Sequence, residues 1–96
     1  METRNADVER CNQRCAAARR MRDPTACLVA AREAVRLDSA HPMGWRNLCW
    51  SLWTLRRYAD ASAACRSAAA HRDWRPRVRA RIMTLDRACS MMMALE

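Results

Sequence analysis

Apolar residues recur along the chain at spacings of three and four, the period that buries one face of an α-helix. Near the beginning of the chain the recurring positions are Val8, Cys11, Cys15 and Ala18. Near the end they are Val78, Ile82, Leu85, Cys89 and Met92. Alanine, arginine, leucine and methionine dominate, whereas β-branched residues are scarce and phenylalanine is absent. This balance favours helices over strands and predicts an all-α fold.

The three prolines divide the helical pattern. Asp23-Pro24 is a helix cap followed by proline at the first helical position, and Pro42 and Pro76 open two further helices in the same way. The pattern predicts five helices, the first beginning near Thr3 or Asn5 and the others covering about 24–38, 42–57, 58–70 and 76–95. Short connections between them predict two antiparallel helix pairs and a closing helix.

A shift of 34 residues aligns the landmarks of the chain with one another. It places Cys15 on Cys49, Ala34 on Ala68, Pro42 on Pro76 and Leu48 on Ile82. A period of 34 is typical of a helix–turn–helix repeat. The best copy begins at Trp45 and continues with Leu48, Cys49, Leu52, Tyr58, Ala61, Cys65 and Ala68.

That copy resembles the tetratricopeptide repeat, which has tryptophan, leucine, glycine and tyrosine on its first helix and tyrosine, alanine, an aromatic residue and alanine on its second. The resemblance is weaker elsewhere: Cys11 stands at the tryptophan position of the first repeat and Arg79 at that of the third. It implies an antiparallel helix-hairpin solenoid forming one domain over residues 1–96. We expect a first repeat at about 8–41, a second at about 42–75 and a closing helix at about 76–95. Small residues are expected where helices approach most closely.

The resemblance also implies a function in binding other proteins, as an adaptor or an accessory subunit of a larger assembly. Some members of the family hold the C-terminal carboxylate of heat-shock chaperones with an asparagine and basic residues. On this register the concave face offers Asn12, Asn47, Trp50, Arg77 and Arg81, which we expect to bind an acidic or C-terminal peptide. A solvated, charged helix face is the alternative interpretation.

The net charge of +8 comes from 18 basic residues, all of them arginine. A basic surface attracts acidic peptides, nucleic acid or anionic membranes. Because tryptophans lie among the arginines, RNA binding by a basic helical repeat is an alternative function. We expect no enzyme, cofactor or metal, since no metal-ligand triad, glycine-rich phosphate loop or nucleophile–base pair is recognisable.

The six cysteines have two interpretations. Small, buried, reduced residues at helix contacts are the simpler one. Alternatively, Cys15 with Cys27 and Cys49 with Cys65 lie on facing sides of predicted helix pairs, where disulfides would staple a structural protein of an oxidising organelle.

The last helix carries apolar residues on more than one side, at Met91, Met92, Met93 and Leu95. A terminal repeat helix normally has a polar outer face. We therefore expect this end to dock onto another protein, and a frayed terminus is the alternative. No apolar run is long enough to span a membrane and no secretory signal is recognisable. We expect an intracellular protein, cytoplasmic by default, with mitochondria or another organelle as alternatives.

Overall fold

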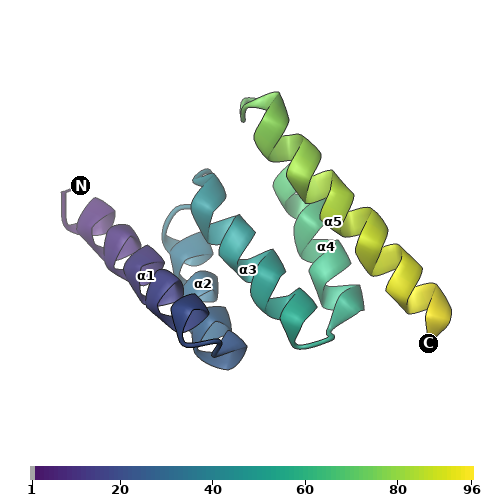
Figure 1. Ribbon diagram of the computed structural model, residues 1–96. Coiled ribbons are helices and arrows are strands. Elements are labelled where there is room, and N and C mark those ends of the chain that lie inside the picture. The colour runs from purple at the N-terminus through teal and green to yellow at the C-terminus, as the bar shows by residue number, and fades with distance from the viewer. Residues whose placement is uncertain (1) are drawn as a thin grey trace.

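The computed structural model describes residues 2–96, which form five α-helices and no strand, as the sequence predicts (Figure 1). The helices are α1 (Glu2–Arg20), α2 (Pro24–Leu37), α3 (Pro42–Thr54), α4 (Tyr58–Ala69) and α5 (Pro76–Leu95). The first helix begins at Glu2, slightly before the expected start. None of the described helices combines the length and the apolar character needed to cross a membrane.

The helix ends follow from local chemistry. The Asp23 carboxylate accepts a hydrogen bond from the Ala26 amide at 3.1 Å and so caps α2, with proline at the first position as predicted. His41 caps α3 through its Nδ1, which accepts from the Met43 amide at 3.2 Å. Proline also begins α3 and α5, because it lacks an amide hydrogen that would be unpaired there anyway.

The helices form two layers. Each helix packs against the next one along the chain, and α1 and α5 also contact α3. As a result α1, α3 and α5 lie side by side in the near layer of Figure 1, with α2 and α4 behind them. The central helix α3 contacts all four others, so its residues connect the whole structure.

Small side chains fill the contacts between the helices. The small residues expected at the closest approaches are all buried, with at most 1% of their surface exposed: Cys15, Cys27, Ala34, Cys49, Ala61 and Ala68. Gly44 belongs to the same class, because a Cβ atom at this position would lie 3.3 Å from the Ala34 Cβ. Among the larger apolar residues of the predicted stripes, Leu28, Leu48, Leu52 and Ile82 belong to this core. Others, such as Val35, Trp45 and Leu85, are only partly buried around it.

Trp74 ties the turn before α5 to the turn before α3. Its indole stacks on the His71 ring, with 4.4 Å between the ring centroids, and its Nε1 donates a hydrogen bond to the Ala40 carbonyl at 2.7 Å. Trp45 similarly donates to the Ser39 carbonyl at 2.7 Å. These bonds satisfy the indole nitrogens and fix the turns at one end of the layer formed by α3 and α5.

Candidate functional site

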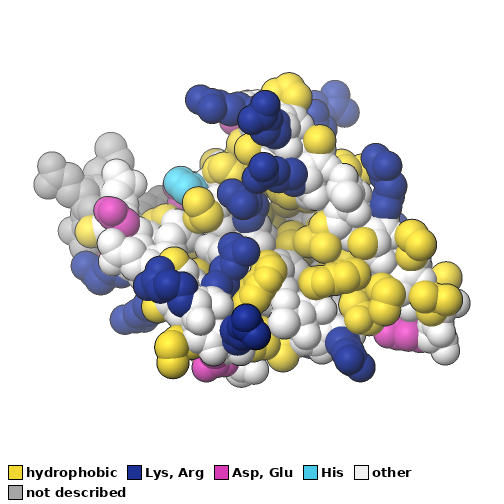
Figure 2. Space-filling model, in the orientation of Figure 1, with side chains coloured by type: hydrophobic (Ala, Val, Ile, Leu, Met, Phe, Trp, Pro, Cys, Tyr) yellow, Lys and Arg dark blue, Asp and Glu magenta, His cyan; other side chains and the backbone are white. Residues whose placement is uncertain are grey.

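A hollow of about 160 Å³ lies on the face formed by α1, α3 and α5. Each of these helices contributes one arginine to its lining: Arg19 from α1, Arg46 from α3 and Arg81 from α5. The rest of the lining comes from Cys49, Trp50, Ile82 and Leu85. We call this hollow and its lining the arginine groove. In Figure 2 basic side chains gather over α3 and the first half of α5, whereas apolar side chains cover the second half of α5.

Arg19 is held in the groove by two contacts with α3. Its Nη1 donates a hydrogen bond to Asn47 Oδ1 at 3.2 Å, and its guanidinium carbon lies 4.9 Å from the centroid of the Trp50 ring. Asn47 is only 3% exposed. A cation within about 6 Å of an indole centroid is attracted to the ring face. Asn47 therefore positions Arg19 over Trp50 and presents little surface of its own to a ligand.

The positive charge of the groove is not balanced by its surroundings. No carboxylate is among the lining residues, and none of the ion pairs among the described side chains involves Arg19, Arg46 or Arg81. Close guanidinium groups beside an apolar surface attract an anion and strengthen their interaction with it, because part of the water is excluded. The groove therefore has the chemistry to hold a carboxylate or phosphate attached to an apolar group.

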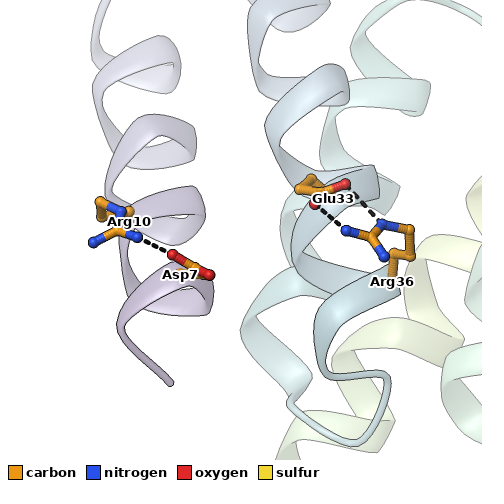
Figure 3. Close-up of polar contacts among 4 residues, drawn as sticks. All are labelled: Asp7, Arg10, Glu33 and Arg36. Atoms are coloured by element: carbon orange, nitrogen blue, oxygen red, sulfur yellow. Dashed lines mark hydrogen bonds and ion pairs between the residues drawn. The ribbon is translucent and has the colours of Figure 1, made fainter. Parts of the chain in front are cut away.

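In a second hollow, between α1 and α2, arginines and carboxylates line the surface together. Figure 3 shows its two carboxylates paired with arginines on their own helices, Asp7 with Arg10 and Glu33 with Arg36. The Arg36 Nε donates to Glu33 at 2.9 Å, and this hydrogen bond lowers the pKa of the Glu33 carboxyl. Exposed pairs of this kind balance charge locally and contribute little to stability.

The structure brings together three of the five residues predicted to bind a peptide. Trp50 and Arg81 line the groove, and Asn47 supports it from beneath. Asn12 instead lines a separate hollow between α1 and the turn before α3, and Arg77 is exposed on the first turn of α5 outside the lining. These two residues are not placed with the other three.

Neither Arg19 nor Arg46 was assigned to the binding face from the sequence. The position of Arg46, four residues before Trp50, placed both on one side of α3 and was a usable signal. Arg19 gave no such signal, because its contact with Trp50 depends on the packing of α1 beside α3.

The four apolar residues near the end of α5 do not form one exposed face. Met91 and Leu95 are exposed, at 68% and 78% of their surface. Met92 and Met93 are half-buried and pack against the core. The predicted docking set is thus divided between two sides of the helix.

All six cysteines are buried thiols in the described structure. Burial, together with the neighbouring Cys27 and Cys11 thiols, raises the pKa of Cys15 from 9.0 to about 12. A hydrogen bond with Cys49, followed by burial, raises the pKa of Cys65, and burial raises that of Cys89 to about 11. No cluster of three metal-binding side chains occurs among residues 5–96, whose side chains the structure describes.

Comparison of the chain with protein-family models, curated proteins and solved structures gave no match.

Proposed function

We propose that the chain is a non-catalytic protein-interaction module, a small tetratricopeptide-like adaptor or accessory subunit, whose arginine groove binds an acidic peptide segment of another protein. One observation carries the proposal: Arg19, Arg46 and Arg81 converge from three helices on one apolar hollow without a carboxylate among its lining. The 34-residue spacing of landmarks and the hairpin packing of neighbouring helices support the kinship with the tetratricopeptide family.

The size and chemistry of the groove define the peptide that it would bind. A volume of about 160 Å³ is below the roughly 300–1,000 Å³ of small-molecule pockets and suits a single apolar side chain. The guanidinium groups around it match carboxylates in geometry and charge. The expected ligand is therefore an extended segment in which one apolar residue is flanked by glutamates or aspartates.

Fluorescence anisotropy with a labelled synthetic peptide, one leucine flanked by glutamates, tests the proposal. Arg46→Ala and Arg81→Ala are each expected to weaken binding roughly tenfold, since a hydrogen bond to a charged group contributes about 1.5–3 kcal/mol. Arg32→Ala is the matched control. It removes the same charge from α2, outside the groove lining, and should change affinity only through weak long-range attraction.

A single-stranded uridine oligonucleotide of equal length serves as the competing probe, because an arginine over an indole also suits a stacked base. Tighter binding of this RNA, with affinity falling steeply as salt rises, would replace the peptide-binding proposal with RNA binding. The proposal is also rejected if the peptide does not bind, or if Arg32→Ala weakens binding as much as the groove variants do.

A further inference from the structure

Two pairs of cysteines meet between the helices of the two hairpins. Cys15 on α1 and Cys27 on α2 are neighbours across the first hairpin. The Cys15 Sγ donates to the Cys27 carbonyl oxygen at 3.8 Å, the Cys27 Sγ donates to the Asn47 carbonyl oxygen at 3.7 Å, and the Cys27 thiol contributes to the raised pKa of Cys15. Cys49 on α3 and Cys65 on α4 are both buried where these two helices pack, and the nearby Cys49 thiol is the leading cause of the raised pKa of Cys65. All four are at most 1% exposed. Each pair therefore occupies the dry contact between two antiparallel helices.

The second pair is not a simple copy of the first. Cys15 and Cys49 are 34 residues apart, but Cys27 and Cys65 are 38 apart, so the second cysteine has moved by one helical turn. Residues four apart lie on the same helix face. The residue 34 positions after Cys27 is Ala61, and the residue 34 positions before Cys65 is Ala31. Both alanines are fully buried. Alanine is small enough for these helix contacts, so packing alone does not require cysteine. Both hairpins nevertheless place one buried cysteine opposite another.

The remaining two cysteines are less suited to pairing. Cys11 lies one turn before Cys15 on the same helix, and its Cα–Cβ bond is tilted in the same direction. A disulfide needs Cβ atoms about 3.5–4.5 Å apart with bonds that converge. Burial and, to a smaller extent, the nearby Cys65 raise the pKa of Cys89 on α5, whereas the leading cause of the raised pKa of Cys65 is Cys49.

We propose that Cys15–Cys27 and Cys49–Cys65 are two dithiol sites that close into disulfides, each joining the two helices of one hairpin. The oxidant is a small-molecule disulfide such as glutathione disulfide. A thiolate of the pair attacks one glutathione sulfur and releases a glutathione thiolate, which takes up a proton. The second cysteine loses its proton and attacks the protein sulfur of the mixed disulfide, releasing the second glutathione. Two protein thiols thereby lose two electrons and two protons, and glutathione disulfide gains them. This inference does not rest on the proposed peptide binding, although Cys49 also lines the groove.

The packing of the folded state determines which of the two disulfides forms first. Fully buried thiols with raised pKa values react slowly, so exchange requires local opening of a hairpin. Helix α1 packs only on α2 and α3, whereas α3 and α4 are enclosed by neighbours that include α2 and α5. The hairpin of α1 and α2 opens more readily, and Cys15–Cys27 is therefore expected to close first.

The experiment exposes the purified, reduced chain to glutathione disulfide in urea below its unfolding midpoint. Samples are alkylated over time, digested and mapped by mass spectrometry. The expected bridges are Cys15–Cys27, then Cys49–Cys65, with Cys11 and Cys89 alkylated. The helical circular dichroism should be retained, and the thermal midpoint should rise by about 10 °C or more per bridge and return on reduction.

Two variants identify which cysteines form the disulfides. Cys27→Ala should remove the first bridge and leave Cys49–Cys65, whereas the control Cys11→Ala should keep both. The wild-type map decides the inference even if a variant does not fold. Absence of intramolecular bridges, a majority of Cys11–Cys15 or Cys65–Cys89 links, or a lowered thermal midpoint in the oxidised protein would each overturn it.

Discussion

Asp86 is the one acidic side chain among the buried residues of the described structure, and its neighbours explain how it is accommodated. It lies on the face of α5 that packs against α4, with 9% of its surface exposed. The hydroxyl of Ser62 on α4 donates a hydrogen bond to Asp86 Oδ1, and the Arg66 Nε lies 3.6 Å from Oδ2. A carboxylate at such a position depends on these partners, because burial without them is costly.

We therefore expect Ser62→Ala to lower the free energy of unfolding by about 1–3 kcal/mol, the cost of leaving a buried acceptor without its donor. Ser67→Ala is the matched control, since Ser67 is exposed on the same helix, and it should change stability by less than about 0.5 kcal/mol. Urea denaturation followed by circular dichroism measures both. Equal effects of the two substitutions would show that the Ser62–Asp86 hydrogen bond does not stabilise the fold.

Two helices end with a left-handed residue that is not glycine. Arg22 after α1 has φ of 55° and Arg56 after α3 has φ of 61°. In both cases the next amide reaches back five residues, from Asp23 to the Ala18 carbonyl at 2.8 Å and from Arg57 to the Leu52 carbonyl at 2.9 Å. This is the hydrogen-bond pattern of a Schellman C-cap, whose left-handed position glycine usually occupies. The two positions are 34 residues apart, so the turn chemistry follows the same period as the core.

Replacing either arginine with glycine is expected to raise the free energy of unfolding by about 1 kcal/mol, because a side chain in the left-handed region costs about 1–2 kcal/mol. Arg22→Ala and Arg56→Ala are the controls: alanine removes the charge but keeps the Cβ atom, and should give no such gain. Chemical denaturation of the four variants gives the comparison. If alanine and glycine variants were equally stable, the backbone strain at these positions would be negligible.

The positions of the helices could be predicted from the sequence more fully than the residues that line the groove. Prolines 24, 42 and 76 mark three helix starts directly in the sequence, because a proline fixes its own backbone wherever the chain folds. Asn12 and Arg77 were expected beside Asn47, Trp50 and Arg81, but a position on a helix does not determine which side chains of other helices it meets. Arg19 meets Trp50 only because α1 packs beside α3, and this contact spans 31 residues.

At the scale of the whole molecule, the protein is a thin slab measuring 44 × 31 × 18 Å. The side chains with at most 1% of their surface exposed are all small, mainly cysteines and alanines, and the larger Leu52 and Ile82 follow at 3%. Stability therefore rests on many small contacts between neighbouring helices. These contacts are unequally distributed, because α3 touches every other helix whereas α1 touches α2 and α3 alone.

This unequal distribution of contacts predicts that the helices open locally at different free energies. Amides in the middle of α3 should be at least about tenfold more protected from hydrogen exchange than amides in the middle of α1, since opening α1 breaks fewer contacts than opening α3. Hydrogen exchange with mass spectrometry of peptic fragments, at neutral pH and without denaturant, measures the difference. The same experiment on the chain with Cys15 and Cys27 bridged provides the control, because tying α1 to α2 should reduce the difference. Equal protection of α1 and α3 in the reduced chain would instead mean that the five helices open as one unit, despite the central position of α3.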